Sequence, residues 1–216
     1  MRALHELLNH AEPALPLIAA WARDAELPVE LLPPSAACDA VLLALQVTTR
    51  SPLGAMAHGT GGVLVDGGWL RLLGSGHPRL PRDLAAWNQP RGDGFLLIGD
   101  DAVGGFFAIN GGALGADRGG IYYLAPDTQA WEALEMGHTA FMQWAFSSRL
   151  RDFYRDLRWE SWQADVAALD ADSCMSFYPF LFTAQGSVHT SARRPTPVAE
   201  HYAFMCQGGT QACSSP

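Results

Sequence analysis

The neighbouring carboxylates Asp100 and Asp101 are the residues whose surroundings best suit them for chemistry. They lie in the segment GDDAVGG, between apolar runs at residues 95–98 and 106–109. On a glycine-rich loop, this pair would offer hydrogen-bond acceptors to a partner or a contact for a cation. Aspartate also commonly caps the backbone of its own turn, so a structural role is the alternative. Asn110, which precedes two glycines, has the same two interpretations because asparagine and glycine tolerate positive φ.

Trp69 is the aromatic residue with the clearest claim to a binding role. It opens an apolar run directly after two glycines, and an exposed tryptophan there would anchor an interface. Burial is the alternative, because the Leu-Arg-Leu-Leu that follows is typical of a core strand. We therefore carry four candidate binding residues forward: Asp100, Asp101, Asn110 and Trp69.

A second candidate site would combine His58 and Asp66 with Asp100 in the pocket of a small-molecule-binding protein or hydrolase-type enzyme. The spacing of these residues matches no set of metal ligands. Other catalytic signatures are missing from the sequence, including GxSxG, GxGxxG after a strand, and HExxH. The chain also contains no lysine, which excludes P-loop and Schiff-base chemistry. We expect no catalytic residue set, no metal and no cofactor.

Composition limits the class of partner. The 216 residues carry a net charge of −8, whereas nucleic-acid binders need a basic surface to displace phosphate counterions. The most apolar early run, residues 15–22, contains Pro16 and is too short to span a bilayer. The first residues also lack the pattern of a secretory signal. We expect a cytoplasmic protein that binds neither nucleic acid nor membrane.

The candidate residues must be positioned by a sheet. Apolar runs at residues 95–98, 106–109 and 121–124 are joined by short Gly-, Asp- and Asn-rich segments. These connections cannot hold a crossover helix, so the strands should form an antiparallel meander. Residues 63–65 and 69–73 predict a hairpin, and shorter strands are expected at residues 29–32, 131–134 and 177–182.

Helices should flank this sheet. Met142, Phe146, Leu150, Phe153 and Leu157 recur at three- and four-residue steps, which predicts one long helix with an apolar stripe. Further helices are expected within residues 2–25, 35–45 and 81–88. The fold class is therefore α+β, with a central, mostly antiparallel sheet in a single domain over residues 1–205 and a frayed tail at 206–216.

The middle of the chain resembles a known superfamily. The segments GFLLIGDDAVGGFFAIN, GIYYLAPDTQAWEAL and HTAFMQWAF are similar to the core of the SUKH superfamily of Smi/Knr-type domains. Many bacterial relatives of these domains are toxin-immunity proteins. The fuller pattern, including SPLGAMAHGTGGVLVDGGWLRLLGSG, resembles a bacterial family described only as a domain of unknown function.

The resemblance implies a SUKH-like sheet flanked by helices, and binding rather than catalysis. We therefore expect a non-enzymatic protein-binding module, for example a cytosolic toxin-immunity protein. The expected partner is a protein such as a basic toxin domain, because opposite net charge speeds association. The sequence leaves the oligomeric state open.

Overall fold

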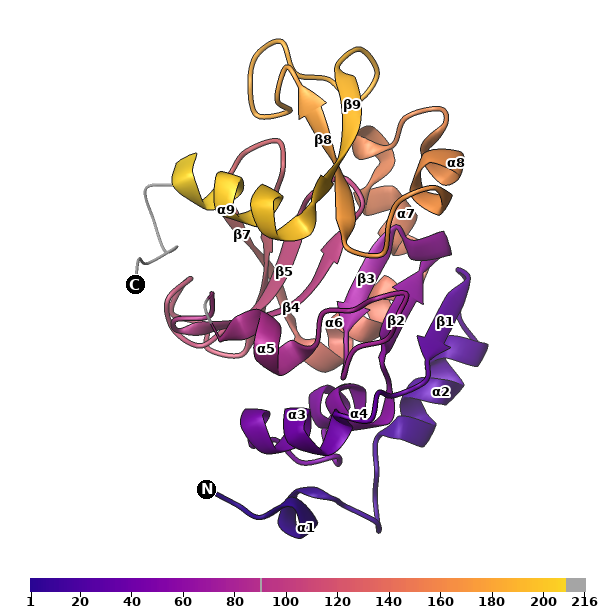
Figure 1. Cartoon of the computed structure of the whole chain (residues 1–216), viewed down its shortest axis with the longest axis vertical. Helices are drawn as coiled ribbons and strands as arrows, with labels where there is room; N and C mark the ends of the chain where they lie inside the picture. Colours follow the sequence, from indigo (N-terminus) through magenta and orange to yellow (C-terminus); the bar gives the residue numbers. More distant parts are fainter. Residues whose placement is uncertain (90, 209–216) are drawn as a thin grey trace.

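A computed structural model describes residues 1–89 and 91–208 of the chain. Its central element is a seven-stranded antiparallel sheet in which each strand pairs with the next one along the chain (Figure 1). The strands are β1 (Val29–Leu32), β2 (Gly62–Val65), β3 (Leu70–Leu73), β4 (Phe95–Asp101), β5 (Phe106–Asn110), β6 (Gly120–Leu124) and β7 (Trp131–Gly137). The predicted α+β class and antiparallel meander are confirmed.

The connection between β2 and β3 shows how glycine sets this topology. The 3-10 turn η1 (Asp66–Gly68) places Gly67 at φ 73° and Gly68 at φ 91°. Residues with side chains rarely adopt such angles. Two glycines in succession therefore let the chain reverse directly into β3.

Helices pack around this sheet. They are α1 (Leu4–Leu7), α2 (Leu15–Arg23), α3 (Cys38–Leu45), α4 (Pro52–Gly59), α5 (Leu84–Asn88), α6 (His138–Ala145), α7 (Arg149–Phe153), the 3-10 turn η2 (Arg155–Leu157), α8 (Trp162–Ala167) and α9 (Val198–Gly208). The longest of these described helices, α9, has 11 residues, about half of what a membrane crossing requires. None of the helices in the described ranges could therefore span a bilayer.

The prediction of one long helix through Leu157 is wrong. The helical segment divides into α6, α7 and η2. The break follows Ala145, where the Ser147 hydroxyl donates a hydrogen bond of 2.8 Å to the carbonyl oxygen of Trp144. Such local bonds compete with helix continuation. Most of the apolar stripe is buried nonetheless, with Met142 and Leu150 at 0% exposure, while Phe153 and Leu157 at its end are partly buried.

A second, two-stranded sheet was only partly foreseen. It consists of β8 (Ser173–Tyr178) and β9 (Ala192–Pro197), and β9 was not predicted. The hairpin stands at one end of the molecule with α9 at its base (Figure 1). Helix α9 runs to Gly208, past the predicted start of the frayed tail at residue 206. The rest of that prediction, residues 209–216, falls outside the described residues.

Candidate functional site

Asp100 and Asp101 do not lie on the glycine-rich loop where the sequence predicts them. They form the end of β4, and their residue exposures are 1% and 0%. Successive residues of a strand point to opposite faces of the sheet. The two carboxylates accordingly have separate sets of partners.

Asp100 is the centre of a buried charge network. It lies directly opposite Arg71 of β3, and its carboxylate forms ion pairs with the guanidinium groups of Arg71 and Arg82. Although burial opposes ionisation, these two arginines hold the pKa of Asp100 below its usual value. The network reaches the hairpin, because Arg71 donates to the carbonyl oxygen of Ser173 at 2.6 Å and Arg82 pairs with Asp172 at 2.5 Å.

Asp101 connects the other face of the sheet to the helices. Its carboxylate accepts hydrogen bonds from the hydroxyls of Tyr123 at 2.8 Å and Tyr154 at 2.7 Å. It also accepts backbone N–H bonds from Val103 at 3.1 Å and Gly105 at 2.7 Å. Burial raises the pKa of Asp101, although these hydrogen bonds oppose the rise. Asp101 therefore caps its own turn, as the structural alternative held.

Asn110 also closes its own loop. Its side-chain oxygen accepts N–H bonds from Gly112 at 2.7 Å and Leu114 at 3.1 Å, and its amide donates to the carbonyl oxygen of Gly115 at 2.9 Å. The residue is 1% exposed. Its hydrogen-bonding groups are thus directed into the loop rather than toward solvent.

Trp69 is a core residue with 0% exposure. Its ring centroid lies 5.3 Å from that of Tyr154 and 5.1 Å from that of Trp162. The Arg158 guanidinium lies 4.8 Å from the same ring and donates to Asp66 at 2.7 Å. Trp69 thus joins β3 to the segment around α8.

The second predicted site does not assemble. His58 pairs with Asp39 at 2.9 Å, whereas the ion-pair partners of Asp66 are Arg151 of α7 and Arg158. Asp100 has a third, separate set of partners. A direct binding role for the four predicted residues stays a prediction, and in this structure a partner would have to displace core contacts to reach them.

The β8–β9 hairpin carries the exposed groups most suited to recognition. Tyr178, at the end of β8, is 72% exposed. It borders a hollow of about 340 Å³ whose other lining residues include Phe180, Arg193 and Arg194. Both arginines are exposed on β9. We call Tyr178, Phe180, Arg193 and Arg194 the hairpin surface.

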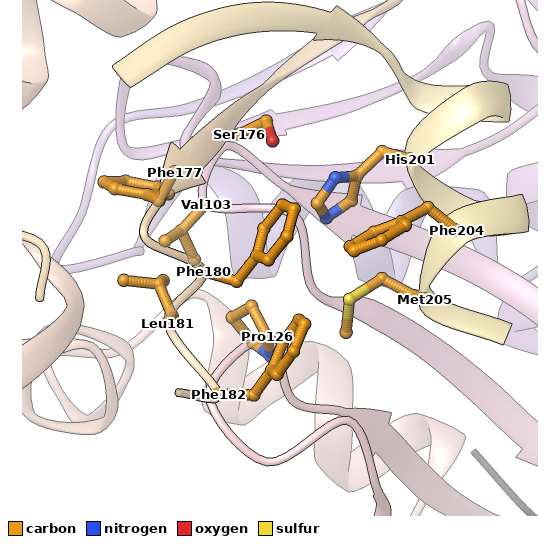
Figure 2. Close-up of a pocket in the computed structure, with 10 residues that line it drawn as sticks. All are labelled: Val103, Pro126, Ser176, Phe177, Phe180, Leu181, Phe182, His201, Phe204 and Met205. Atoms are coloured by element: carbon orange, nitrogen blue, oxygen red, sulfur yellow. The ribbon is translucent and has the colours of Figure 1, made fainter. Parts of the chain in front are cut away.

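An aromatic cluster supports the hairpin surface from below. The ring centroid of Phe180 lies 5.3 Å from that of Phe182 and 4.7 Å from that of Phe204 on α9. Figure 2 shows these rings around a cavity of about 10 Å³, which has room for about one water molecule. The cluster is therefore a packed base for the hairpin rather than a ligand pocket.

His201 belongs to the same cluster and connects it to the central sheet. Its Nε2 donates a hydrogen bond to the carbonyl oxygen of Gly104 at 3.1 Å. Because a carbonyl oxygen can only accept, Nε2 of His201 carries the proton. Gly104 has φ 94°, and a Cβ there would lie 2.2 Å from the Nε2 of His201. Burial lowers the pKa of His201, against the effect of the hydrogen bond to Gly104.

A second hollow lies against β2 and β3. It measures about 360 Å³, and the residues around it include Leu64, Arg71, Arg79 and Asp170. An adjoining hollow of about 220 Å³ shares Leu64 and Arg79. The Nε of Arg71 is buried and has no hydrogen-bond partner among the described residues.

Sequence reasoning missed the hairpin surface. The sequence predicts a strand at residues 177–182, and it indicates no role for the segment ARRPTP at residues 192–197. The informative signal was an Arg-Arg pair beside prolines in an otherwise arginine-poor stretch. Proline within a strand is typical of a sheet edge, where neighbouring side chains are accessible.

Comparisons with known proteins identify a family without a known activity. The model of the family described as "Protein of unknown function DUF2625" matches residues 4–201. The "Putative uncharacterized protein YbfG" of Escherichia coli (strain K12) is 47% identical over 194 residues, covering 88% of this chain and 90% of that protein. An "Uncharacterized protein" of Haemophilus influenzae is 35% identical over 192 residues, covering 84% and 83% of the two chains.

No solved structure matches the chain. The expectation of a family of unknown function is confirmed. The narrower likeness to the SUKH superfamily stays a prediction.

The Asp100 network yields a prediction about stability. Replacing Asp100 with asparagine leaves Arg71 buried without a counter-charge and leaves Arg82 with Asp172 alone, which should lower the free energy of unfolding by about 3–5 kcal/mol. The matched control is Asp172→Asn, which removes the partly exposed partner of Arg82 (side chain 48% exposed) and should cost about 1 kcal/mol or less. Urea denaturation measures both variants. Equal losses would contradict a central role for Asp100.

The buried His201 yields a prediction about pH. Because the folded-state pKa of His201 lies below the ordinary histidine value of about 6.5, the unfolded chain binds a proton more readily. The contribution of His201 to stability is therefore complete above about pH 6.5 and is lost as the pH falls toward the folded-state value. Urea midpoints between about pH 7 and pH 5 should fall less steeply in His201→Gln than in the wild type. The exposed control, His10→Gln, should keep the wild-type slope, and a slope unchanged in His201→Gln would refute this assignment.

Proposed function

Since this chain belongs to the DUF2625 family of proteins of unknown function, we propose that it is a non-enzymatic protein-binding module. The proposal assigns partner contact to the hairpin surface. The observation that carries it is the 72% exposure of Tyr178 beside Arg193, Arg194 and a hollow of about 340 Å³. Tyrosine and arginine are enriched among the residues that dominate binding energy at protein interfaces.

The hairpin surface combines exposure with a rigid base. The Phe180 ring packs on Phe204, and the amide of Met175 on β8 donates to the carbonyl oxygen of Ala102 at 2.8 Å. These contacts hold the strands in place before a partner arrives. Pre-organisation of this kind lowers the entropy cost of binding.

The partner proposed from the resemblance is a basic protein such as a toxin domain, so the narrower role would be that of a cytoplasmic immunity protein. A net charge of −8 supports long-range attraction to a basic partner. At short range, Arg194 would bind carbonyl or carboxylate oxygens of that partner, whereas the Arg193 guanidinium already donates to the carbonyl oxygen of Val188 at 3.1 Å. If the partner is basic, the association rate should fall as ionic strength rises.

A small-molecule-binding protein is the second candidate function. One observation favours it: the hollow of about 360 Å³ reaches Arg71, whose buried Nε has no partner among the described residues. An acceptor atom of a ligand could satisfy that group. The hollow involves neither His58 nor Asp66, so this candidate differs from the site expected from the sequence.

Site-specific photo-crosslinking tests the protein-binding proposal. A photoreactive phenylalanine analogue placed at position 178 should capture one defined protein in the native host. The same analogue at position 17 is the matched control, because Leu17 is 49% exposed on α2, outside the hairpin. The captured protein is then purified and its dissociation constant is measured.

We expect Tyr178→Ala and Arg194→Ala each to weaken binding of this purified partner by about tenfold or more, and Leu17→Ala to leave it unchanged. Identical crosslinked products from positions 178 and 17 would contradict the proposal. So would a dissociation constant that neither hairpin substitution alters.

A further inference from the structure

Three residues with metal-binding side chains meet where α3 begins and α4 ends. Cys38 and Asp39 are the first residues of α3, and His58 lies in the last turn of α4. Their potential ligand atoms all lie within 4.8 Å of one another, and the Asp39 Oδ1 is 2.9 Å from the His58 Nε2. Among the described residues, no other three His, Cys, Asp or Glu side chains meet in this way.

The chemistry of this group suits a transition metal. A tetrahedral zinc ion binds thiolate, imidazole and carboxylate at about 2.0–2.3 Å, which places its ligand atoms about 3.3–3.6 Å apart. The Asp39–His58 separation of 2.9 Å is shorter than that range, and no separation within the group exceeds 4.8 Å. Side-chain rotations would therefore bring the three ligand atoms into place. A thiolate and an imidazole favour zinc or cobalt over magnesium and calcium, which prefer oxygen ligands.

The helices that carry the ligands are firmly positioned. Val41 and Leu42 of α3 pack in the core together with Met56 and Ala57 of α4. The start of α4 is fixed by the Ser51 hydroxyl, which accepts the amide of Gly54 at 3.1 Å. The backbones are therefore arranged before any ion binds, and only side chains must move.

The site is also accessible. Asp39 and His58 have side-chain exposures of 58% and 28%, and Cys38 is partly exposed. An ion could enter from solvent without opening the fold. Figure 1 places α3 and α4 at the opposite end of the molecule from β8 and β9, so this site is separate from the hairpin surface.

We propose that Cys38, Asp39 and His58 form a binding site for a zinc-like divalent transition metal ion, with the fourth coordination position open to water. Three protein ligands with one open position are typical of accessible zinc sites. No sequence motif points to this site, because an adjacent Cys-Asp pair with a distant histidine follows no known spacing of metal ligands. The site depends on the packing of α3 against α4.

Titration of the full chain with Co²⁺ alone tests the proposal. We expect one ion per chain and a thiolate-to-cobalt charge-transfer absorption band. Cys38→Ser should abolish the band. Cys174 should not produce one, because it is 0% exposed and burial raises its pKa to about 12.

Zinc affinity, measured by calorimetry, provides the second readout. Loss of even an outer-shell partner typically weakens metal binding about 10- to 100-fold, so Cys38→Ser and His58→Gln should each weaken it at least that much. The control His77→Gln, a histidine outside the cluster, should bind like the wild type. Circular dichroism should show all the variants folded, because the ligands are not core residues.

Two results would overturn the proposal. One is the absence of a thiolate-to-cobalt band in the wild-type chain. The other is zinc binding that persists unchanged in both Cys38→Ser and His58→Gln, which would place the ion elsewhere. A bound ion should also raise the thermal midpoint of the wild type but not of these two variants.

Discussion

The buried pair Asp100–Asp101 is the constraint on which the rest of this structure depends. Adjacent strand residues face opposite sides of the sheet. The two carboxylates of this dipeptide therefore bind residues on both faces. Asp100 forms ion pairs with Arg71 and Arg82, and these arginines in turn contact the start of the β8–β9 hairpin. Asp101 accepts hydrogen bonds from Tyr123 and Tyr154, and Tyr154 connects it to the helical segment beyond α7. Burying two carboxylates costs free energy unless each is fully paired. Loss of any of these partners would therefore destabilise the fold.

The sequence was sufficient to predict the central sheet but not the arrangement of the elements that pack on it. Short glycine-rich connections leave antiparallel pairing as the available topology, and β1 to β7 follow it. The helix break near Ser147 accompanies a local side-chain hydrogen bond, and the pairing of ARRPTP with β8 is a tertiary contact. Hydrophobic periodicity encodes neither of them. The same limit applies to Asp100, since the sequence shows a polar pair beside glycines but not the two arginines that neutralise it.

The functional proposals depend on which residues maintain the fold and which remain accessible. Groups that looked chemically attractive in the sequence maintain the fold, as Trp69 does among the aromatic rings around α8. The two proposed sites lie on elements at opposite ends of the molecule, β8 and β9 at one end and α3 and α4 at the other (Figure 1). The hairpin surface at one end offers Tyr178 and arginines, and the Cys38–Asp39–His58 cluster at the other offers metal ligands.

Native-state hydrogen exchange tests the central claim most directly. The amides of Val103 and Gly105 donate to Asp101, and the amide of Met175 donates to Ala102. If the carboxylate pair joins sheet, helices and hairpin into one cooperative unit, these amides should exchange only by global unfolding, with the same free energy as amides of β5. Exchange several orders of magnitude faster than that of β5 would show that the hairpin opens independently, and would contradict the account.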